Sequence, residues 1–305
     1  MQITVAICTW NRAKLLDQTL AAICKLEVPT GVEWEILIVN NNCTDDTDEV
    51  IASYSTRIPV RIAFEARPGV SHARNAAVRE AKGDYILWTD DDVLVYPDWI
   101  CSYCEAIRSH PEAGFFGGPI GPWFEGIQPD WLTRCFSQVS YAYAAIDLGE
   151  KPFLLSKKKQ PFGANFAVRM KEQMVFHYDP SLGRKRGNSI GGEESAVFNA
   201  MLDAGIEGWW VPDARVNHYI SRERQTIKYL RNYFIGIGQT LSVMEPDISS
   251  VRLFGKPRYL WRKAFESEAL FRLHRLFSNP ETWIEYLISA CIAWGQLGCV
   301  KGAYI

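Results

Sequence analysis

The sequence lacks an excess of charge of either sign, and it lacks a framework of paired cysteines. Its 33 Lys and Arg residues nearly balance its 35 Asp and Glu residues, so the formal net charge is -2. This balance gives no electrostatic reason to expect nucleic acid as a partner. The 8 Cys are scattered, and Cys101-x-x-Cys104 has no second pair at metal-site spacing. Two thiols on one face of a helix are therefore favoured over a zinc or redox site.

Long hydrophobic segments are also missing. Residues 1–5 have neither the basic start nor the apolar run of a signal peptide, so we expect a cytoplasmic protein in a reducing setting. Residues 283–300 are apolar but include Glu285 and Gln296, which favours a packed C-terminal helix over a transmembrane one. The alternative is peripheral association with the cytoplasmic membrane surface through this C-terminal helix.

The Gly-rich loops of common nucleotide-binding folds are absent. Neither Gly-x-Gly-x-x-Gly after the first strand nor Gly-x-x-x-x-Gly-Lys occurs, which argues against a Rossmann dinucleotide fold and against a P-loop. Instead, short apolar runs alternate with helical spacing. We predict strands at residues 3–8, 34–39, 60–64 and 85–89, and helices at residues 15–23, 50–54 and 71–82, with Gly83 as the stop of the last helix. The alternation predicts an α/β fold with a mostly parallel central sheet flanked by helices.

Polar clusters follow three of the predicted strands. They occupy residues 9–12, 40–42 and 90–92. In a parallel sheet the ligand lies beyond the carboxyl ends of the strands, so we expect the clusters to converge on one crevice. After residue 115 the pattern changes to Gly- and Pro-containing loops, a strand within residues 161–169, a Gly191-Gly192 turn that leads to a helix ending near Leu202, and a helix over residues 225–242.

The acidic run Asp90-Asp91-Asp92 is the most informative cluster. Three adjacent carboxylates repel one another unless a cation lies near them. Mg²⁺ and Mn²⁺ prefer oxygen ligands and commonly bridge carboxylates to substrate phosphates. In an extended segment Asp90 and Asp92 would point to the same side. An acidic turn in solvent is the simpler alternative, but the strand before it favours a metal-and-phosphate site.

Several spaced motifs together resemble the family 2 glycosyltransferases. They are Cys8-Thr9-Trp10-Asn11-Arg12, Val39-Asn40-Asn41-Asn42-Cys43-Thr44-Asp45-Asp46-Thr47, Gly69-Val70-Ser71-His72-Ala73-Arg74-Asn75, Ala81-Lys82-Gly83-Asp84-Tyr85-Ile86 and Thr89-Asp90-Asp91-Asp92. The resemblance spans roughly residues 3–240 and implies the GT-A fold with an inverting, metal-dependent transfer. It divides the chain into a nucleotide-sugar-binding half (1–115), an acceptor-binding and catalytic-base half (116–245) and a helical C-terminal extension (246–305).

The resemblance also implies roles for single residues. The nucleotide-sugar donor would be bound by Thr9, Asn11, Arg12, Asn41, Arg74, Asp90, Asp91 and Asn165. Asn41 stands where the family commonly has Asp against the base, so the nature of the base is open, with a UDP-sugar favoured. On sequence alone Arg74 could equally be an exposed helix residue. The metal, Mn²⁺ or Mg²⁺, would be held by Asp92, Asp90 and His218, although a lone His is otherwise more often structural.

Glu193-Glu194 matches the Glu-Asp pair of the family, which makes Glu194 the expected general base. An acidic start of a helix is the structural alternative for this pair. Arg222 and Arg224 are candidate phosphate contacts, although exposed arginines are simpler, and Trp131 and Trp210 are candidate acceptor platforms.

We therefore expect an inverting glycosyltransferase that moves a sugar to a hydroxyl of a glycan or a lipid-linked acceptor. One alternative is an inactive protein of the same fold that binds carbohydrate or nucleotide. A nucleotidyltransferase is a weaker alternative, because the segment around Arg12 has no glycines to bind a triphosphate.

Overall fold

The computed structural model describes residues 1–182, 192–244 and 251–298. The chain forms two compact units. Unit 1 contains Met1–Trp123 and Ala144–Tyr219, and unit 2 contains Phe124–Tyr143 and Ile220–Ile305. The predicted three-part division by function stays a prediction, because these units are defined by packing and not by what each part binds.

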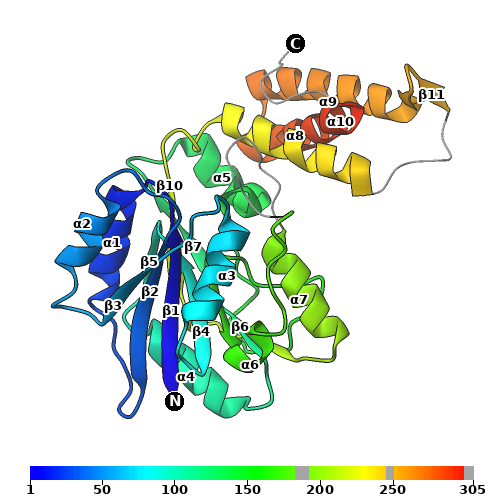
Figure 1. Ribbon diagram of the computed structural model, residues 1–305. Coiled ribbons are helices and arrows are strands. Elements are labelled where there is room, and N and C mark those ends of the chain that lie inside the picture. Colours follow the sequence, from blue (N-terminus) through cyan, green and yellow to red (C-terminus); the bar gives the residue numbers. More distant parts are fainter. Residues whose placement is uncertain (183–191, 245–250, 299–305) are drawn as a thin grey trace. The chain divides into compact units, whose positions relative to one another are not determined.

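Unit 1 is built on a large sheet and a small sheet (Figure 1). The strand order of the large sheet is β3 (Val60–Phe64), β2 (Glu33–Asn40), β1 (Gln2–Thr9), β4 (Tyr85–Asp90), β8 (Asn165–Arg169), β6 (Phe115–Gly117) and β9 (Gly208–Trp210). The first four strands are parallel, β8 runs antiparallel to β4 and β6, and β9 is parallel to β6. The small sheet has the order β5 (Val93–Val95), β10 (Val216–Ile220) and β7 (Ile120–Phe124). The predicted mostly parallel sheet is confirmed.

Helices cover both faces of the large sheet. One face packs against α1 (Ala13–Ile23), α2 (Thr47–Ser53) and α4 (Trp99–Ser109), and the other packs against α3 (Val70–Glu80) and α7 (Glu193–Asp203), while the short α6 (Met170–Gln173) follows β8. In β1, Val5 belongs to the core under the first face and Ala6 to the core under the second. This two-sided burial explains why β1 is a continuous apolar run and not an alternating one.

The role predicted for Gly83 is wrong. Helix α3 ends at Glu80, three residues before Gly83. A Cβ atom on Gly83 would lie 2.5 Å from the backbone nitrogen of Thr4 and 2.7 Å from the carbonyl oxygen of Tyr85. Gly83 is therefore required by the close approach of the chain to β1 and not by a helix cap.

Unit 2 is helical. It contains α5 (Asp130–Val139), the 3-10 helix η1 (Ser140–Tyr143), α8 (Ile227–Met244), a hairpin of β11 (Arg252–Leu253) and β12 (Lys256–Pro257), α9 (Arg258–Phe277) and α10 (Pro280–Leu297). Helix α10 packs against α5, α8 and α9, and Trp283, Ile284 and Leu287 lie in its buried core. The predicted packed C-terminal helix is therefore confirmed as far as Gly298, and residues 299–300 lie outside the described part of the chain. None of the helices described is long and apolar enough to cross a membrane.

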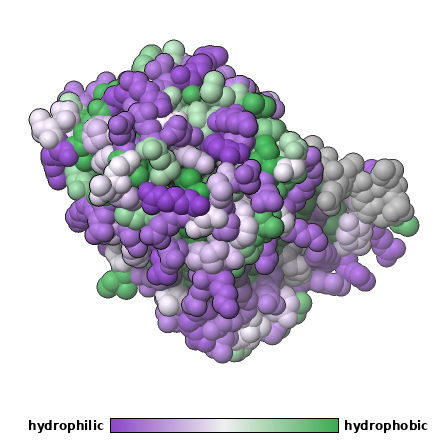
Figure 2. Space-filling view, turned by 90° about the horizontal axis from the view of Figure 1, so that it is seen from below, coloured by the Kyte–Doolittle hydropathy of each residue, from purple (hydrophilic) through white to green (hydrophobic). Residues whose placement is uncertain are grey.

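Hydrophilic residues dominate the face of the molecule seen in Figure 2. Hydrophobic residues on this face lie in small, separate areas, as is usual for a surface in contact with water.

Candidate active site

The carboxyl ends of three parallel strands bring the predicted polar clusters together. Thr9 pairs in register with Asn40 across β1 and β2, and Cys8 pairs with Asp90 across β1 and β4. The expected convergence on one edge of the sheet is confirmed. Because the residues lie at the ends of buried strands, the sheet fixes their positions.

Arg12 neutralises much of the acidic run. Its Nη1 atom lies 3.0 Å from Asp91 Oδ1 and 2.7 Å from Asp92 Oδ2. Burial alone would lower the pKa of Arg12, but the charges of Asp91 and Asp92 outweigh it and raise the pKa. The repulsion among the aspartates is thus reduced by a residue of the protein before any cation binds.

Asp91 is an internal anchor. Thr9 Oγ1 donates a hydrogen bond of 2.7 Å to Asp91 Oδ2, and Thr19 Oγ1 donates one of 3.0 Å to its backbone oxygen. Burial raises the pKa of Asp91 to about 7. Thr9 and Asp91, both predicted to face the donor, are buried and bonded to each other.

The expected alternation of the three aspartates is also wrong. Strand β4 ends at Asp90, so Asp91 and Asp92 both reach Arg12, while Asp90 lies beside Arg74. Asp90 has 37% of its side chain exposed, against 6% for Asp91 and 5% for Asp92. Asp90 is therefore the aspartate most accessible to a donor.

Arg74 is the centre of the site. Its Nη1 atom lies 2.6 Å from Glu194 Oε1 and 3.2 Å from Glu193 Oε1, and its Nη2 atom lies 3.9 Å from Asp90 Oδ1. The residue is only 3% exposed, which excludes the exposed-helix alternative. Three carboxylates from two distant segments share one buried guanidinium.

Aromatic rings enclose this guanidinium. Its Cζ atom lies 5.4 Å from the ring centre of Tyr178, 5.8 Å from that of Trp88 and 6.0 Å from that of Phe166. These rings exclude water and attract the cation through their faces. Sequence reasoning missed Tyr178 and Phe166, because no local pattern in the sequence relates them to Arg74.

The two glutamates at the start of α7 differ in protonation. Burial would raise the pKa of Glu194, but the charge and hydrogen bond of Arg74 outweigh it and lower this pKa. Burial and the charge of Glu194 raise the pKa of Glu193 to about 7. Glu194 is therefore the more fully ionised member of the pair at neutral pH, and a general base must be ionised.

Gly163 makes room for the Glu194 carboxylate. A Cβ atom at position 163 would collide with Glu194 Oε1 and lie 2.8 Å from Arg74 Nη2. The Gly163 carbonyl also accepts a hydrogen bond of 3.4 Å from Arg74 Nη2. Of the predicted Gly191-Gly192 turn before α7, Gly192 has a φ of 99° and Gly191 lies outside the described residues.

His218 reaches the acidic run through the small sheet. Register places His218 opposite Val93, and His218 Nε2 lies 3.4 Å from Asp92 Oδ1. Two ligands each about 2.1 Å from one ion lie roughly 3 Å apart when they are at right angles. The spacing of Asp92 and His218 therefore fits two ligands of one divalent ion.

Within the residues that the structure describes, no three His, Cys, Asp or Glu side chains come together as a possible metal site, so the predicted set of Asp90, Asp92 and His218 is not assembled. A Mg²⁺ ion usually keeps one or two protein carboxylates and takes further oxygens from water and substrate phosphates. Asp92 and His218, with Asp90 nearby in sequence, match such an incomplete protein ligand set.

Two of the predicted donor contacts hold loops instead. Asn41 donates hydrogen bonds to the carbonyls of Glu65 and Arg67 and accepts one from Gly69 N. Asn11, at a positive φ of 52°, accepts a hydrogen bond from Thr44 N. These two side chains shape the rim of the site, and both N–H groups of the Asn41 amide are already used.

The prediction that Asn165 lines the sugar site is wrong. Its side chain is fully buried. It donates to the carbonyls of Pro119 (2.9 Å) and Ala214 (2.6 Å), and it accepts from Trp99 Nε1 and Tyr103 Oη (both 2.8 Å). Asn165 therefore ties β8 to helix α4 and to the loops before β7 and β10.

The other candidates from the sequence have the following surroundings. Trp210 is fully buried and donates to the Gly149 carbonyl at 2.8 Å, so it cannot be an acceptor platform. Trp131 belongs to unit 2 and packs against Trp283. Also in unit 2, Arg224 lies over the rings of Tyr143 and Tyr229, and Arg222 is exposed.

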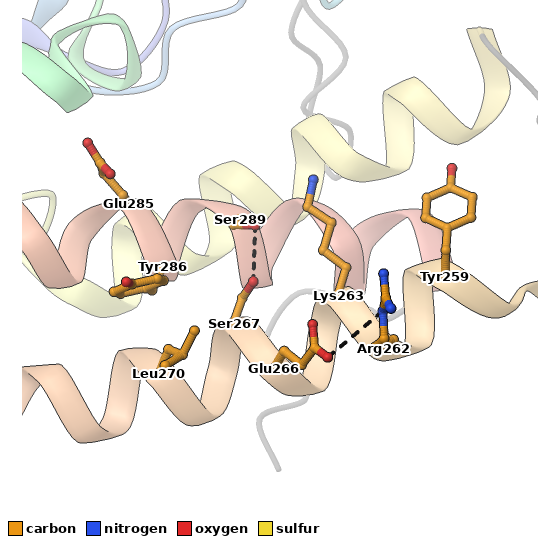
Figure 3. Close-up of a pocket in the computed structure, with 9 residues that line it drawn as sticks. All are labelled: Tyr259, Arg262, Lys263, Glu266, Ser267, Leu270, Glu285, Tyr286 and Ser289. Carbon is orange, nitrogen blue, oxygen red and sulfur yellow. Dashed lines mark hydrogen bonds and ion pairs between the residues drawn. The ribbon is translucent and has the colours of Figure 1, made fainter.

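A cavity of about 430 Å³ lies between α9 and α10 of unit 2 (Figure 3). Lys263, Glu266 and Glu285 line it together with Ser267 and Ser289, which are hydrogen-bonded at 3.1 Å. It contains none of the predicted site residues.

Comparison with known proteins gives one family. The family model described as Glycosyl transferase family 2 matches residues 4–166, which is more than half of the chain. The succinoglycan biosynthesis protein ExoM of Rhizobium meliloti (strain 1021) is 22% identical over 245 residues, which cover 79% of this chain and 74% of that protein. Validoxylamine A glucosyltransferase of Streptomyces hygroscopicus subsp. jinggangensis (strain 5008) is 31% identical over 106 residues, 34% of this chain and 25% of that protein.

Solved structures share the fold. The mannosyltransferase PcManGT from Pyrobaculum calidifontis, in complex with GDP-Man and Mn²⁺, matches with a TM-score of 0.56 and 16% identity over 97% of this chain and 87% of that one. S. aureus TarS 1–349 in complex with UDP-GlcNAc matches with a TM-score of 0.51 and 15% identity over 91% of this chain and 74% of that one. At such identities the likeness shows the fold alone.

We predict that Asn165→Leu lowers the free energy of unfolding by about 3 kcal/mol or more, because four buried groups lose a hydrogen-bond partner. Urea denaturation measures this loss. An unchanged unfolding midpoint together with a raised KM for the donor would instead indicate that Asn165 contacts the sugar of the donor.

We also predict a pH-dependent effect of Glu193→Gln. The pKa of Glu193 is about 7 in the folded protein and has an ordinary value of 4.5, so the folded state holds the extra proton between these values. The contribution of Glu193 to stability therefore falls as the pH rises through this window. The variant should gain stability relative to the natural protein between about pH 5 and about pH 8 in urea denaturation. Glu33→Gln, at an exposed position, is the control. If the difference in free energy of unfolding between Glu193→Gln and the natural protein does not change with pH, the raised pKa of Glu193 is contradicted.

Proposed function

The chain belongs to glycosyl transferase family 2 and is a glycosyltransferase of GT-A fold, and we propose that it transfers a sugar with inversion from a nucleoside-diphosphate sugar to an acceptor hydroxyl. The observation that carries the proposal is the sharing of Arg74 between Glu194 and Asp90. It connects an ionised carboxylate to the strand end at which a nucleotide is expected.

Glu194 would act as the general base. Its carboxylate takes the proton of the acceptor hydroxyl while that oxygen bonds to the anomeric carbon of the donor. The bond between this carbon and the phosphate oxygen breaks, and the nucleoside diphosphate leaves with the electron pair. Attack from the face opposite the leaving group inverts the anomeric configuration. Because Arg74 keeps Glu194 ionised, the base is ready without a prior proton loss.

The cationic and metal-binding groups of the chain would stabilise the negative charge of the leaving group. A Mn²⁺ or Mg²⁺ ion held by Asp92 and His218, with oxygens of water and of the donor phosphates, would supply positive charge against the departing diphosphate. The Mn²⁺ in the complex of the mannosyltransferase supports this use of metal. Arg12 orients Asp92 through the 2.7 Å ion pair and thereby keeps this metal-binding carboxylate in place.

The donor and the acceptor are proposed at the level of chemical class. UDP-GlcNAc and GDP-Man in the complexes of the two similar structures support a nucleoside-diphosphate sugar, with a UDP-sugar favoured by the resemblance. The names succinoglycan biosynthesis protein and chondroitin synthase among the relatives support a growing glycan or lipid-linked saccharide as acceptor, and polysaccharide biosynthesis as the process. The cytoplasmic location stays a prediction from the sequence.

Glu194→Gln is predicted to fold and to bind donor but to lose transfer by about a hundredfold or more, because an amide cannot accept the proton. Initial-rate assays and donor titration measure the two properties. Glu193→Gln is the matched control, since it changes a carboxylate on the same guanidinium. Normal turnover by Glu194→Gln, with loss in Glu193→Gln, would assign the base to Glu193.

A thermal-shift screen of nucleoside diphosphates tests the donor and the metal. The preferred diphosphate should raise the unfolding temperature with Mn²⁺, by an amount set by its affinity, and should do so much less in EDTA. Asp92→Asn should lose the metal-dependent part of the shift. Equal shifts in EDTA would contradict the metal site, and binding of a sugar nucleotide without turnover would favour the inactive binding protein.

A further inference from the structure

One surface of unit 2 is both apolar and basic. It is formed by the β11–β12 hairpin, with the residue before it, and by α9, and we call it the apolar–basic face. Its exposed hydrophobic side chains include Val251, Leu253, Phe254, Tyr259, Phe265, Leu270, Leu273, Leu276 and Phe277. Phe254 is 85% exposed and Phe277 is 81% exposed. A group of large exposed apolar side chains commonly marks a surface that binds another partner.

Helix α9 presents apolar residues on two opposite sides. Leu260, Ala264 and Phe271 face inward and are buried. Phe265, Ala269, Leu273 and Leu276 recur at spacings of four, four and three residues and are all exposed. This helical spacing forms a stripe on the side away from the core. Phe265, at the edge of this stripe, still contacts the ring of Trp294 in α10, with the ring centres 5.1 Å apart, whereas Leu273 is 54% exposed and Leu276 is 75% exposed. The outer side of α9 therefore lies largely in solvent.

The hairpin extends this stripe. Phe254 lies at the hairpin tip in the left-handed region, with a φ of 49°, and its ring packs edge-on against Trp261 at 6.0 Å. Trp261 Nε1 donates a hydrogen bond of 3.0 Å to the Leu253 carbonyl, and its ring stacks at 6.4 Å on Phe265. The hairpin and the helix therefore form one aromatic row. A strained tip that exposes a Phe is unusual unless the residue is used.

The charge of the same segment is strongly positive. Residues 251–277 contain seven Lys or Arg and two Glu, although the whole chain has a formal net charge of -2. Glu268 is engaged by Arg231 and Arg272, and Glu266 is paired with Arg262 at 3.8 Å (Figure 3). Arg258 and Lys263 are exposed in the same segment. Arg258 and Arg262 are at helical spacing with Phe265 and Ala269 and so share the side of α9 that carries the stripe, and Lys263 lines the cavity toward α10.

We propose that the apolar–basic face docks on the surface of an anionic lipid bilayer. Aromatic and aliphatic side chains would enter the boundary of headgroups and acyl chains, while Arg and Lys meet lipid phosphates. Charge argues against a second copy of the chain as the occupant. In a two-fold dimer the face would meet itself, and its excess positive charge would be repelled.

This surface differs from the one expected from the sequence. Helix α10 uses its apolar residues, such as Ile284, Leu287 and Cys291, in the core of unit 2. The membrane contact is therefore assigned to residues 251–277 and not to residues 283–300. The inference does not depend on the proposed transfer, because it concerns a surface of unit 2 and needs no turnover to test.

Vesicle flotation with the full chain tests the proposal. The protein should float with vesicles of equal parts phosphatidylcholine and phosphatidylglycerol, and not with pure phosphatidylcholine, and high salt should weaken the binding. Phe254→Ser with Leu276→Ser, and separately Arg258→Glu with Arg262→Glu, should each lower binding by about tenfold or more. Ile127→Ser with Val175→Ser is the control, since both residues are exposed hydrophobic residues outside this face.

Three results would overturn the proposal. They are failure to float with the anionic vesicles at low salt, equal binding to both kinds of vesicle, and equal loss of binding in the control variant. Gel filtration tests the alternative that a second copy of the chain covers this face. If Phe254→Ser with Leu276→Ser converts an oligomer to a monomer while vesicle binding is unchanged, the face is an interface between copies.

Discussion

The buried guanidinium of Arg74 is the interaction on which the rest of the site depends. It lies between Asp90 at the end of β4 and the glutamates at the start of α7, inside a box of aromatic rings. Removal of this cation would leave Glu193 and Glu194 close together with little solvent to screen them. Lysine is a poor substitute, because an ammonium group cannot present the planar fork that contacts several carboxylates at once.

The acidic run shows the same dependence on arginine at a second point. Arg12 comes from the loop after β1 and forms ion pairs with Asp91 and Asp92, while Thr9 donates a hydrogen bond to Asp91. The three aspartates are thereby divided between two arginines. Asp91 is used for structure, Asp92 faces His218, and Asp90 is left the most exposed. A run that looks uniform in the sequence has three environments because the strand ends after its first member.

The fold and the edge of the site could be predicted from the sequence because buried parallel strands are continuous apolar runs. Residues 3–8 and 85–89 were predicted as strands and the structure confirms them, and the polar residues after each strand had to meet at one edge. The burial of Arg74 could not be predicted, since its aromatic box comes from β4, β8 and the segment after α6.

Asn165 and Asn41 were misleading for a related reason. An amide in a loop beside a predicted site has the same sequence signature whether it binds a ligand or ties two segments together. Only the full set of hydrogen-bond partners separates the two cases, and these partners lie far away in the chain. The exposed stripe of α9 was missed because a helix with a buried apolar side gives no local sign that its other side is apolar as well.

Gly163 limits what can stand opposite the start of α7. The carboxylate of Glu194 occupies the space where a side chain at position 163 would begin, and that side chain would also lie 2.8 Å from Arg74 Nη2. Any residue with a Cβ atom at position 163 would therefore push against both the acid and its cation, so one missing side chain keeps the other two in contact.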